Sequence, residues 1–365
     1  MDQKKSVAIL GAGVAGLVSA KTLKQYGFEV TVFEAKSSLG GVWANNYKSL
    51  RVLEPKCVYG IPDWPWPNNT PLFPPAKDVC RYLTRYAQHF GIFDAIRFDT
   101  QVVKASPTAK NRWVVETRSN GRAKSQEFDF FVIAPGMFSQ PKPPVWPGME
   151  TFEGSIIHSS ELKDTKQISG QHVVIVGFSR SAMDIAVDAT QDAATVTVVH
   201  RSVRWPVPEK IAGLIRNHVL LFARWPTVFV PPWIRHSKGV AFLHKHASVL
   251  VNGFWKFFEV LLNQQFKLRH RDLTPDRPIK LDLFTNLYIT PRRFFPLVDS
   301  GGIRTHRAAI AKADERGLQL STGRHIHADV IICATGWHRD YSYMTDGILN
   351  TILDDDGMHL YRHMV

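Results

Sequence analysis

The sequence contains few cysteines, and the three present are far apart. Cys57, Cys80 and Cys333 form neither a C-x-x-C pair nor a spacing typical of zinc ligands. We therefore predict no metal site and a reducing, intracellular compartment. A signal-peptide pattern is also absent, because residues 1–5 lead directly into an apolar run. Both absences favour a cytoplasmic location.

Long apolar runs are absent as well. The most apolar stretch, residues 247–262, is interrupted by Asn252, Lys256 and Glu259. It is too short and too polar to span a bilayer. The pattern favours an amphipathic core helix, and a helix lying on a membrane surface is the less favoured alternative.

The basic excess is not concentrated in blocks. Lysine and arginine number 45 against 32 aspartates and glutamates, which gives a net charge of +13. No basic block with interleaved aromatic residues, the pattern typical of single-strand binding, is present. We interpret the charge as a solvated surface that attracts anionic cofactors, and we predict no nucleic-acid partner.

What the sequence does contain is a glycine turn between two apolar runs near its start. Gly11, Gly13 and Gly16 have the spacing G-x-G-x-x-G, and a helical pattern and a second apolar run follow them. Glu34 ends that second run, at about the distance of 20 residues expected for a ribose-binding acid. This order is typical of a dinucleotide-binding unit. The glycines allow close approach of the phosphates and the helix, and the acid accepts hydrogen bonds from ribose hydroxyls.

The same order recurs in the second half of the chain. An apolar run enters a turn containing Gly177, Ser179 and Ser181, and a helical pattern and another apolar run follow. Gly177 corresponds to Gly11, so the two units form a pseudo-repeat. Ser179 stands where the first unit has its second glycine, and we expect it to fit a pyrophosphate less closely.

The two units differ at the residue that should contact the ribose. The counterpart of Glu34 is His200, which is followed by Arg201 and Arg204. An acid suits a free 2′-hydroxyl, whereas arginine suits a 2′-phosphate, to which a charge-assisted hydrogen bond contributes about 1.5–3 kcal/mol. The sequence therefore predicts FAD in the first unit and NADPH in the second.

Two similar apolar runs and a stiff connector indicate the domain organisation. Residues 128–136 and 328–336 each form a buried strand pattern that ends in a glycine turn, and the connector at 140–148 is rich in proline. We predict an α/β fold with two Rossmann-like dinucleotide-binding domains, the second inserted into the first. The predicted boundaries are 1–165 and 325–365 for the FAD-binding domain and 166–324 for the NADPH-binding domain, with a helical insert at about 209–306.

A second glycine-containing loop follows Glu34. Gly41 and Trp43 suit a loop whose backbone approaches a ligand closely, and an ordinary turn with a packing indole is an equal alternative.

Together these motifs resemble the flavin-containing monooxygenases, the class B flavoprotein group of N- and S-oxygenating enzymes. The resemblance covers nearly the whole chain. Its most specific element is the pattern F-x-G-x-x-x-H, formed here by Phe152, Gly154 and His158 just before the second unit. Thr335 and Gly336 also match the family. The residues expected at the cofactors are thus Gly11, Gly13, Gly16, Glu34, Gly41, Trp43, Gly177, Ser179, Ser181, Arg201, Arg204, Thr335 and Gly336.

The resemblance implies a reaction as well as a fold. NADPH would reduce FAD, oxygen would add to the reduced flavin to give a C4a-hydroperoxyflavin, and one oxygen atom would pass to a nitrogen or sulfur of a small molecule. The expected activity resembles that of N,N-dimethylaniline monooxygenase, and in some relatives the acceptor is a carbonyl carbon. The chemistry belongs mostly to the cofactors, which agrees with the absence of a recognisable catalytic triad.

The sequence departs from the family at several positions. Leu53 takes the presumed flavin-facing place where animal members carry an asparagine, and Leu162 replaces an aromatic residue after the F-x-G-x-x-x-H pattern. Relatives also continue beyond the position at which this chain ends. A shortened, catalytically impaired flavoprotein, NADPH oxidase-like or a binding remnant, is therefore the alternative function. A disulfide-type reductase is disfavoured because its redox cysteines lie close together in sequence, whereas Cys57 and Cys80 are well separated.

Overall fold

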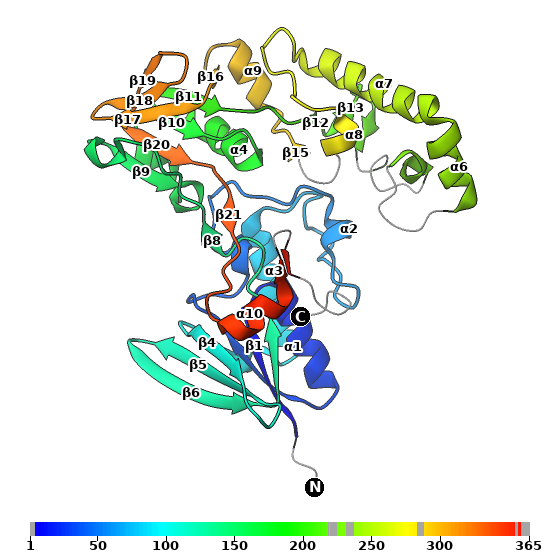
Figure 1. The fold of residues 1–365 in the computed structure, drawn as a ribbon, viewed down its shortest axis with the longest axis vertical. Coiled ribbons are helices and arrows are strands. Elements are labelled where there is room, and N and C mark those ends of the chain that lie inside the picture. Colours follow the sequence, from blue (N-terminus) through cyan, green and yellow to red (C-terminus); the bar gives the residue numbers. More distant parts are fainter. Residues whose placement is uncertain are drawn as a thin grey trace.

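The protein consists of two α/β units that follow one another along its long axis (Figure 1). The structure, a computed structural model, describes residues 4–217, 219, 225–230, 237–282, 288–354 and 357–358. The predicted insert at 209–306 lies partly outside these residues, and the chain end from residue 359 lies wholly outside them.

The first unit is built on a four-stranded parallel sheet. Its elements are β1 (Ser6–Leu10), α1 (Val14–Gln25), β2 (Glu29–Phe33), β3 (Ile96–Arg97) and β7 (Phe130–Ile133). The strand order is β3-β2-β1-β7, so β1 pairs in parallel with both β2 and β7. Val7, Ala8 and Ile9 of β1 are fully buried. The strand, turn, helix and strand expected from the first glycine turn are therefore confirmed.

A second helix packs beside α1. The local elements are η1 (Gly41–Trp43), α2 (Lys56–Tyr59), α3 (Ala76–His89) and η2 (Phe93–Ala95). Val79, Leu83 and Tyr86 recur every three or four residues along α3 and form one core cluster with Leu17 of α1. This packing fixes the position of α1, whose N-terminus begins at the glycine turn.

An antiparallel layer and the last described helix complete the first unit. These elements are β4 (Gln101–Pro107), β5 (Trp113–Ser119), β6 (Arg122–Phe128), α10 (Asp346–Ile352), β22 (Leu353–Asp354) and β23 (Gly357–Met358). The backbone N–H of Ala105 donates to the carbonyl of Tyr343, and Tyr343 and Met344 share a buried cluster with Val102 and Val115. The chain thus returns to the first unit before α10.

The second unit contains a five-stranded parallel sheet. Its elements are β9 (Ser155–His158), β10 (His172–Val176), α4 (Arg180–Ala189), β11 (Thr195–His200), β16 (Arg304–Arg307) and β20 (Val330–Cys333). The strand order is β16-β11-β10-β20-β9. A three-stranded antiparallel sheet adjoins it, formed by β17 (Ile310–Asp314), β18 (Gly317–Leu320) and β19 (His325–His327).

The pairing of β9 and β20 corrects the predicted domain boundaries. We expected residues up to 165 and from 325 onward to belong to the first domain. Instead β20 pairs with β10 on one side and with β9 on the other. All four residues of β20 are buried, so the strand needs neighbours on both edges and cover on both faces. The return to the first unit therefore lies beyond β20.

The segment between β11 and β16 contains short strands and several helices. These are β12 (Pro206–Val207), β13 (Lys210–Ile211), β14 (Ile215–Arg216), η6 (Trp225–Phe229), α6 (Lys238–His246), α7 (Ser248–Phe266), α8 (Ile279–Asp282), β15 (Tyr288–Ile289) and α9 (Phe294–Asp299). The helix predicted at 247–262 is confirmed as α7. It buries Val251, Trp255 and Leu262, but Leu250 and Phe257 on its other face are exposed. Within the described part of the chain, no helix has the length and apolar character needed to cross a membrane.

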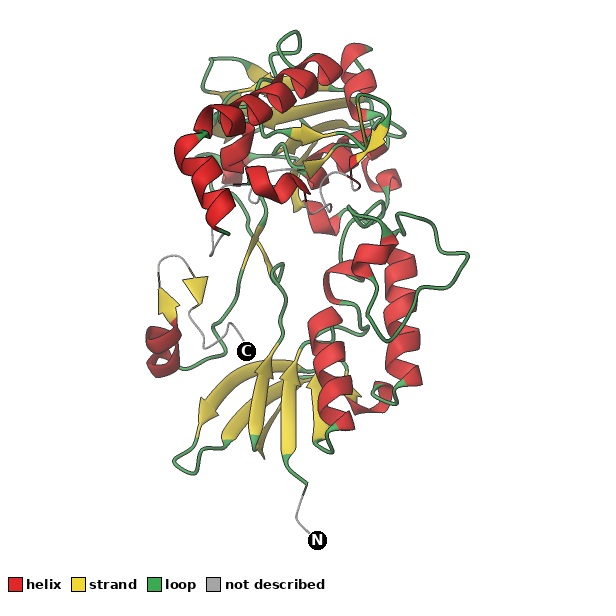
Figure 2. Ribbon diagram, turned by 90° about the vertical axis from the view of Figure 1, so that its right-hand side faces the viewer, coloured by secondary structure: helices red, strands yellow, loops and turns green. Residues whose placement is uncertain are grey.

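Two segments connect the units, as Figure 2 shows from the side. They are β8 (Gln140–Pro141) and β21 (Trp337–His338), which pair with each other in antiparallel fashion. Short 3-10 turns on the way into the second unit are η3 (Met149–Thr151), η4 (Ser159–Glu161) and η5 (Thr165–Ile168). The second unit is therefore inserted into the first, as predicted.

Candidate functional site: two glycine turns at the ends of parallel strands

The first glycine turn lies at the carboxyl end of β1. Gly11 has a positive φ of 97°, and a Cβ at this position would lie 2.5 Å from the carbonyl oxygen of Ala134. A Cβ at Gly16 would lie 1.9 Å from the carbonyl oxygen of Gly11. Both glycines are therefore required by the packing of the turn itself.

Gly13 differs because space is available beside it. Among the described residues, a Cβ at Gly13 would come within 4 Å of one atom, the Cα of Gly41 at 3.9 Å. Gly13 is also the N-cap residue of α1, and in the described chain no side chain caps this helix and no acid occupies its first turn. Backbone N–H groups at such a helix end, together with the helix dipole, suit an anion.

Glu34 lies beside this turn and is held in place by backbone donors. Glu34 is 7% exposed, and its Oε2 accepts a hydrogen bond of 2.9 Å from the N–H of Ala12. Oε1 accepts one of 2.9 Å from the N–H of Lys36. Each carboxylate oxygen can accept a further hydrogen bond, which is what the two hydroxyls of a ribose would need.

Trp43 and Leu53 lie in the segment that follows Glu34. Trp43 is half-buried and packs edge-on against Tyr59, with ring centroids 6.0 Å apart. The Tyr59 hydroxyl donates to Glu54, and burial raises the pKa of Tyr59 above its usual range. Leu53 is half-buried. Its proposed position at the flavin stays a prediction.

The second glycine turn repeats the geometry of the first. Gly177 has a φ of 130°, and a Cβ there would lie 2.5 Å from the carbonyl oxygen of Ala334. Ser179 has φ −111° and ψ −173°, and Gly13 has φ −79° and ψ −173°. This is extended backbone that any residue adopts, so serine causes no backbone strain at this position.

The first two turns of α4 carry a polar cluster around buried Asp184. Arg180 donates from Nε to Asp184 Oδ2 at 2.6 Å and from Nη1 to the carbonyl of Ile289 at 2.6 Å. The Tyr47 hydroxyl also donates to Asp184, and Ser181 lies beside that hydroxyl. Burial raises the pKa of Asp184, and the Arg180 guanidinium opposes the rise. Ser181, a predicted cofactor ligand, thus lies next to a contact between the units.

At the end of β11, one basic side chain is buried and two are exposed. His200 is 3% exposed and packs on Phe178, with ring centroids 4.2 Å apart. Burial, and the nearby Arg307, lower the pKa of His200 to about 4, so its imidazole is neutral at pH 7. Arg201 and Arg204 are exposed. The arginines, rather than His200, are therefore placed to meet a phosphate at the surface.

The residues of the F-x-G-x-x-x-H pattern pack β9 against its neighbours and against the connection between the units. A Cβ at Gly154 would lie 2.2 Å from the carbonyl oxygen of Asp329 and 2.5 Å from the Phe152 ring. His158 is buried, its Nε2 lies 3.1 Å from the carbonyl oxygen of Gly336, and burial lowers its pKa. A neutral His158 therefore donates to Gly336, and its other ring nitrogen contacts Ser160 at 2.8 Å.

Thr335 and Gly336, the other family residues, lie at this same connection. The Thr335 hydroxyl donates to the carbonyl of Lys142, and the Gly336 carbonyl accepts from the N–H of Lys142 at 3.0 Å. Leu162, which replaces an aromatic residue of the family pattern, is 3% exposed and joins the core cluster of the second unit.

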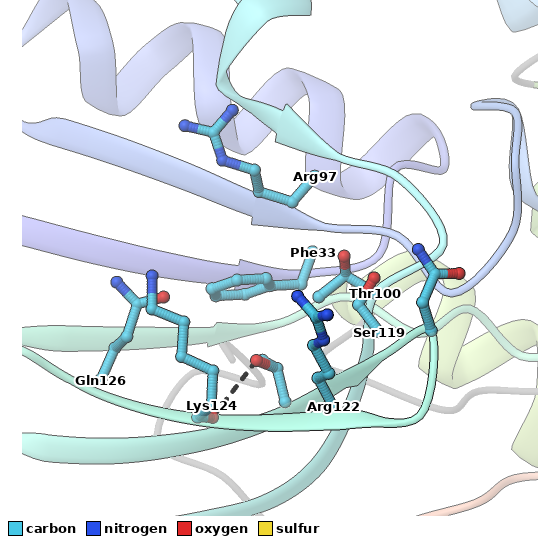
Figure 3. A pocket seen from close by; sticks show the side chains of 9 residues that line it. Phe33, Arg97, Thr100, Ser119, Arg122, Lys124 and Gln126 are labelled. Atoms are coloured by element: carbon cyan, nitrogen blue, oxygen red, sulfur yellow. Dashed lines mark hydrogen bonds between the residues drawn. The ribbon is translucent and has the colours of Figure 1, made fainter.

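A basic cavity at the carboxyl end of β2 was not predicted from the sequence. It has a volume of about 610 Å³ and lies between β2, β3 and the antiparallel layer (Figure 3). Arg97, Arg122 and Lys124 line it, and Thr100, also in its wall, donates its N–H to the carbonyl of Glu34 at 2.9 Å. One feature of the sequence could have indicated this cavity. Arg97 stands at the carboxyl end of a parallel strand, where ligands of such sheets bind.

Comparison with known proteins agrees with this arrangement. A family model described as flavin-binding monooxygenase-like matches residues 4–365. Probable flavin-containing monooxygenase 1 of Arabidopsis thaliana is 28% identical over 91% of this chain and 69% of its own length. Flavin-containing monooxygenase 5 of Homo sapiens is 27% identical over 94% of this chain and 64% of its own length.

Solved structures share the fold. Oxidized steroid monooxygenase bound to NADP has a TM-score of 0.69 and 22% identity, covering 92% of this chain and 71% of that one. S-allyl-L-cysteine S-oxygenase from Allium sativum has a TM-score of 0.60 and 22% identity, covering 97% of this chain and 67% of that one. This chain spans between 51% and 73% of the length of eight curated relatives that it matches.

Proposed function

The chain belongs to the flavin-binding monooxygenase-like family, and from this membership we propose that it is an FAD- and NADPH-dependent monooxygenase. Its substrate would be a small molecule with a nucleophilic nitrogen or sulfur, and its second substrate O₂. The observation that carries this proposal is the pair of glycine turns, one followed by buried Glu34 and the other by exposed Arg201 and Arg204.

The first turn fits the pyrophosphate and ribose of FAD. The space beside Gly13, bounded by Gly41, and the uncapped N-terminus of α1 would receive the pyrophosphate. Glu34, held by the N–H groups of Ala12 and Lys36, would accept hydrogen bonds from the ribose hydroxyls. Gly11 and Gly16 would act indirectly, by allowing the turn to form.

The second turn fits a nucleotide with a 2′-phosphate. Gly177 and Ser179 would bring the backbone to the pyrophosphate at the N-terminus of α4. Arg201 and Arg204 would pair with the 2′-phosphate, since both are exposed immediately after β11. His200, which is buried and neutral, would contribute to the shape of this site and would add no charge to it.

Bound together, the two cofactors would supply hydride transfer and the activation of O₂. The chain's own part is to hold both nucleotides in one orientation and to keep water from the reacting atoms. Tyr47 serves this purpose by joining the first unit to α4 through Asp184. His158 serves it by donating to Gly336 in the connection between the units.

The preference for nitrogen or sulfur, with an activity like that of N,N-dimethylaniline monooxygenase, rests on the family resemblance. The name of one structural neighbour, an S-oxygenase acting on S-allyl-L-cysteine, supports a sulfur acceptor for that protein. We extend it to this chain as part of the proposal. A cytoplasmic location is proposed from the spacing of Cys57, Cys80 and Cys333.

The test is oxygen consumption linked to a substrate. The purified chain is reconstituted with FAD, and oxidation of NADPH and uptake of O₂ are followed with and without a thioether or a tertiary amine. We expect a yellow protein and formation of the sulfoxide or N-oxide in proportion to NADPH oxidised. Oxygen uptake that yields hydrogen peroxide at the same rate without substrate would indicate an oxidase. A colourless protein that leaves NADPH unchanged would refute the proposal.

A further inference from the structure

A group of metal-binding side chains lies at the end of the second sheet away from the glycine turn. His172 begins β10, His327 ends β19, and Asp329 directly precedes β20. One potential ligand atom from each residue lies within 4.8 Å of the other two. Figure 1 places β10, β19 and β20 close together on the same side of the second unit. Segments far apart in the sequence thus bring two imidazoles and a carboxylate together.

Hydrogen bonds orient these side chains, each through one of its polar atoms. His172 Nδ1 lies 2.9 Å from the Thr195 hydroxyl, and His327 Nδ1 lies 3.0 Å from the carbonyl oxygen of Arg316. The carbonyl requires a proton on His327 Nδ1, which leaves Nε2 as the nitrogen that could bind a metal. That Nε2 lies 3.7 Å from Asp329 Oδ1. Histidine ligands of metals commonly bind through one nitrogen while the other is hydrogen-bonded in this way.

One carboxylate oxygen of Asp329 holds a neighbouring strand in place, and the other faces the histidines of the cluster. Its Oδ2 accepts a hydrogen bond of 2.7 Å from the N–H of His172, which fixes the register of β10. The first unit uses Asp129 identically, with Oδ2 accepting from the N–H of Ser6 at 2.7 Å. The structural role of the aspartate is therefore common to both units, and it does not explain the histidines.

The first unit already holds a positive charge at the equivalent place. Ser6 corresponds to His172 because each donates its N–H to the aspartate, and Glu127 corresponds to His327 because each stands two positions before that aspartate. Arg112 Nε lies 3.6 Å from a Glu127 oxygen and 3.4 Å from an oxygen of the first unit's aspartate. In the first unit an arginine side chain is thus the cation between the strands, and in the second unit two imidazoles replace the serine and the glutamate.

We propose that His172, His327 and Asp329 bind a divalent zinc-class cation that joins β10, β19 and β20. Two imidazoles and one carboxylate suit Zn²⁺ or Co²⁺ better than Mg²⁺ or Ca²⁺, which prefer oxygen ligands. Water would complete the coordination. The site lies at the opposite ends of the strands from the nucleotide turn, so its role is to stabilise the second unit.

The geometry requires only a small adjustment of the side chains. Atoms bound to zinc at about 2.0–2.1 Å lie roughly 3.3 Å apart in a tetrahedral site. The present separations of up to 4.8 Å must therefore shorten by about 1.5 Å at most. The side chains of His327 and Asp329 are 54% and 41% exposed, so small rotations of these side chains meet little steric resistance.

The experiment uses the full chain, purified without a histidine tag and treated with a chelator. Zn²⁺ is titrated calorimetrically, Co²⁺ is followed by its visible absorption, and the melting temperature is measured with and without Zn²⁺. His327→Ala and Asp329→Asn remove one ligand each, and asparagine retains an oxygen for the His172 N–H. The matched control is His325→Ala, because His325 lies on the same strand and contacts both oxygens of Asp314 instead.

We expect one Zn²⁺ per chain and a rise in melting temperature. The same should hold for His325→Ala, with binding weakened about tenfold or more in His327→Ala and Asp329→Asn. Equal Zn²⁺ affinity in His327→Ala and the unaltered chain would overturn the proposal, as would no Zn²⁺ binding by the unaltered chain. None of these measurements depends on FAD or NADPH.

Discussion

The Tyr47 hydroxyl donates a hydrogen bond of 3.1 Å to Asp184, although 137 residues separate the two. Tyr47 is 3% exposed and Asp184 is 8% exposed, so the bond is sheltered from water. Tyr47 follows the glycine loop of the first unit, and Asp184 lies in the helix that begins at the second glycine turn. The buried bond therefore joins the segment after the glycine loop of the first unit to the helix that follows the second glycine turn.

Removal of this hydroxyl should weaken the junction. Tyr47→Phe leaves the buried Asp184 carboxylate with one donor fewer, and we expect an apparent free energy of unfolding lower by about 1–2 kcal/mol. Chemical denaturation followed by fluorescence measures the change. Tyr26→Phe is the control, because Tyr26 is 79% exposed. Equal stability of Tyr47→Phe and the unaltered chain would show that the bond contributes nothing to the junction.

Gly13→Val should abolish flavin retention while the fold is kept. Among described residues a Cβ at this position meets only the Cα of Gly41, at an ordinary 3.9 Å, so the extra atoms would enter the space assigned to the pyrophosphate. The flavin absorbance per chain after gel filtration measures the loss. Gly253→Val is the control, since no described atom lies within 4 Å of a Cβ there. A Gly13→Val protein with a full complement of FAD would contradict the first-site assignment.

Arg201→Ala should raise the Michaelis constant for NADPH about tenfold or more and that for NADH little. The reason is the loss of a charge-assisted bond to the 2′-phosphate, which NADH lacks. Steady-state rates of NADPH and NADH oxidation give both constants. Arg324→Ala, at an exposed position in a different turn, serves as the control. Equal changes for both nucleotides would mean that Arg201 does not contact this phosphate.

Acid should destabilise the second unit through His200. Its pKa is about 4 in the folded chain and about 6.5 when unfolded, so between these values the unfolded chain binds a proton that the folded chain excludes. Stability therefore falls as the pH falls through this window, by about 2 kcal/mol at pH 5.

Denaturation at pH 7 and at pH 5 measures this loss. His200→Leu removes the titrating group at a similar volume and should reduce the difference between the two pH values, whereas His270→Gln, at an exposed histidine, should not. An unchanged difference in His200→Leu would assign the acid sensitivity to other groups.

Much of the fold was predictable because its signals are local. The glycine spacing, the apolar runs and Glu34 lie within one short stretch near the start of the chain, and the structure confirms the corresponding strands and helix. The second turn was found by its similarity to the first. The cofactor contacts predicted at these turns are fitted by the geometry and stay predictions.

The assignment of β20 failed for a physical reason that the sequence could have exposed. A fully apolar strand must be buried, but its composition does not say in which sheet. The pseudo-repeat does indicate the sheet. The strand β20 repeats the pattern of β7, and β7 pairs with β1. Because the counterpart of β1 is β10, β20 should pair with β10, as it does. Tyr47 with Asp184, and His172 with His327 and Asp329, offered no such signal, because only the tertiary fold brings them together.

The antiparallel pairing of β8 with β21 constrains how the two units can move. The chain leaves the first unit through one of these segments and returns through the other, and the N–H of Lys142 and the hydroxyl of Ser139 add bonds across the pair. Two hydrogen-bonded strands cannot bend independently, so together with the Tyr47–Asp184 bond they restrict the movement of one unit against the other. A change in the separation of the two glycine turns would accordingly have to break the buried Tyr47–Asp184 bond as well as bend both strands.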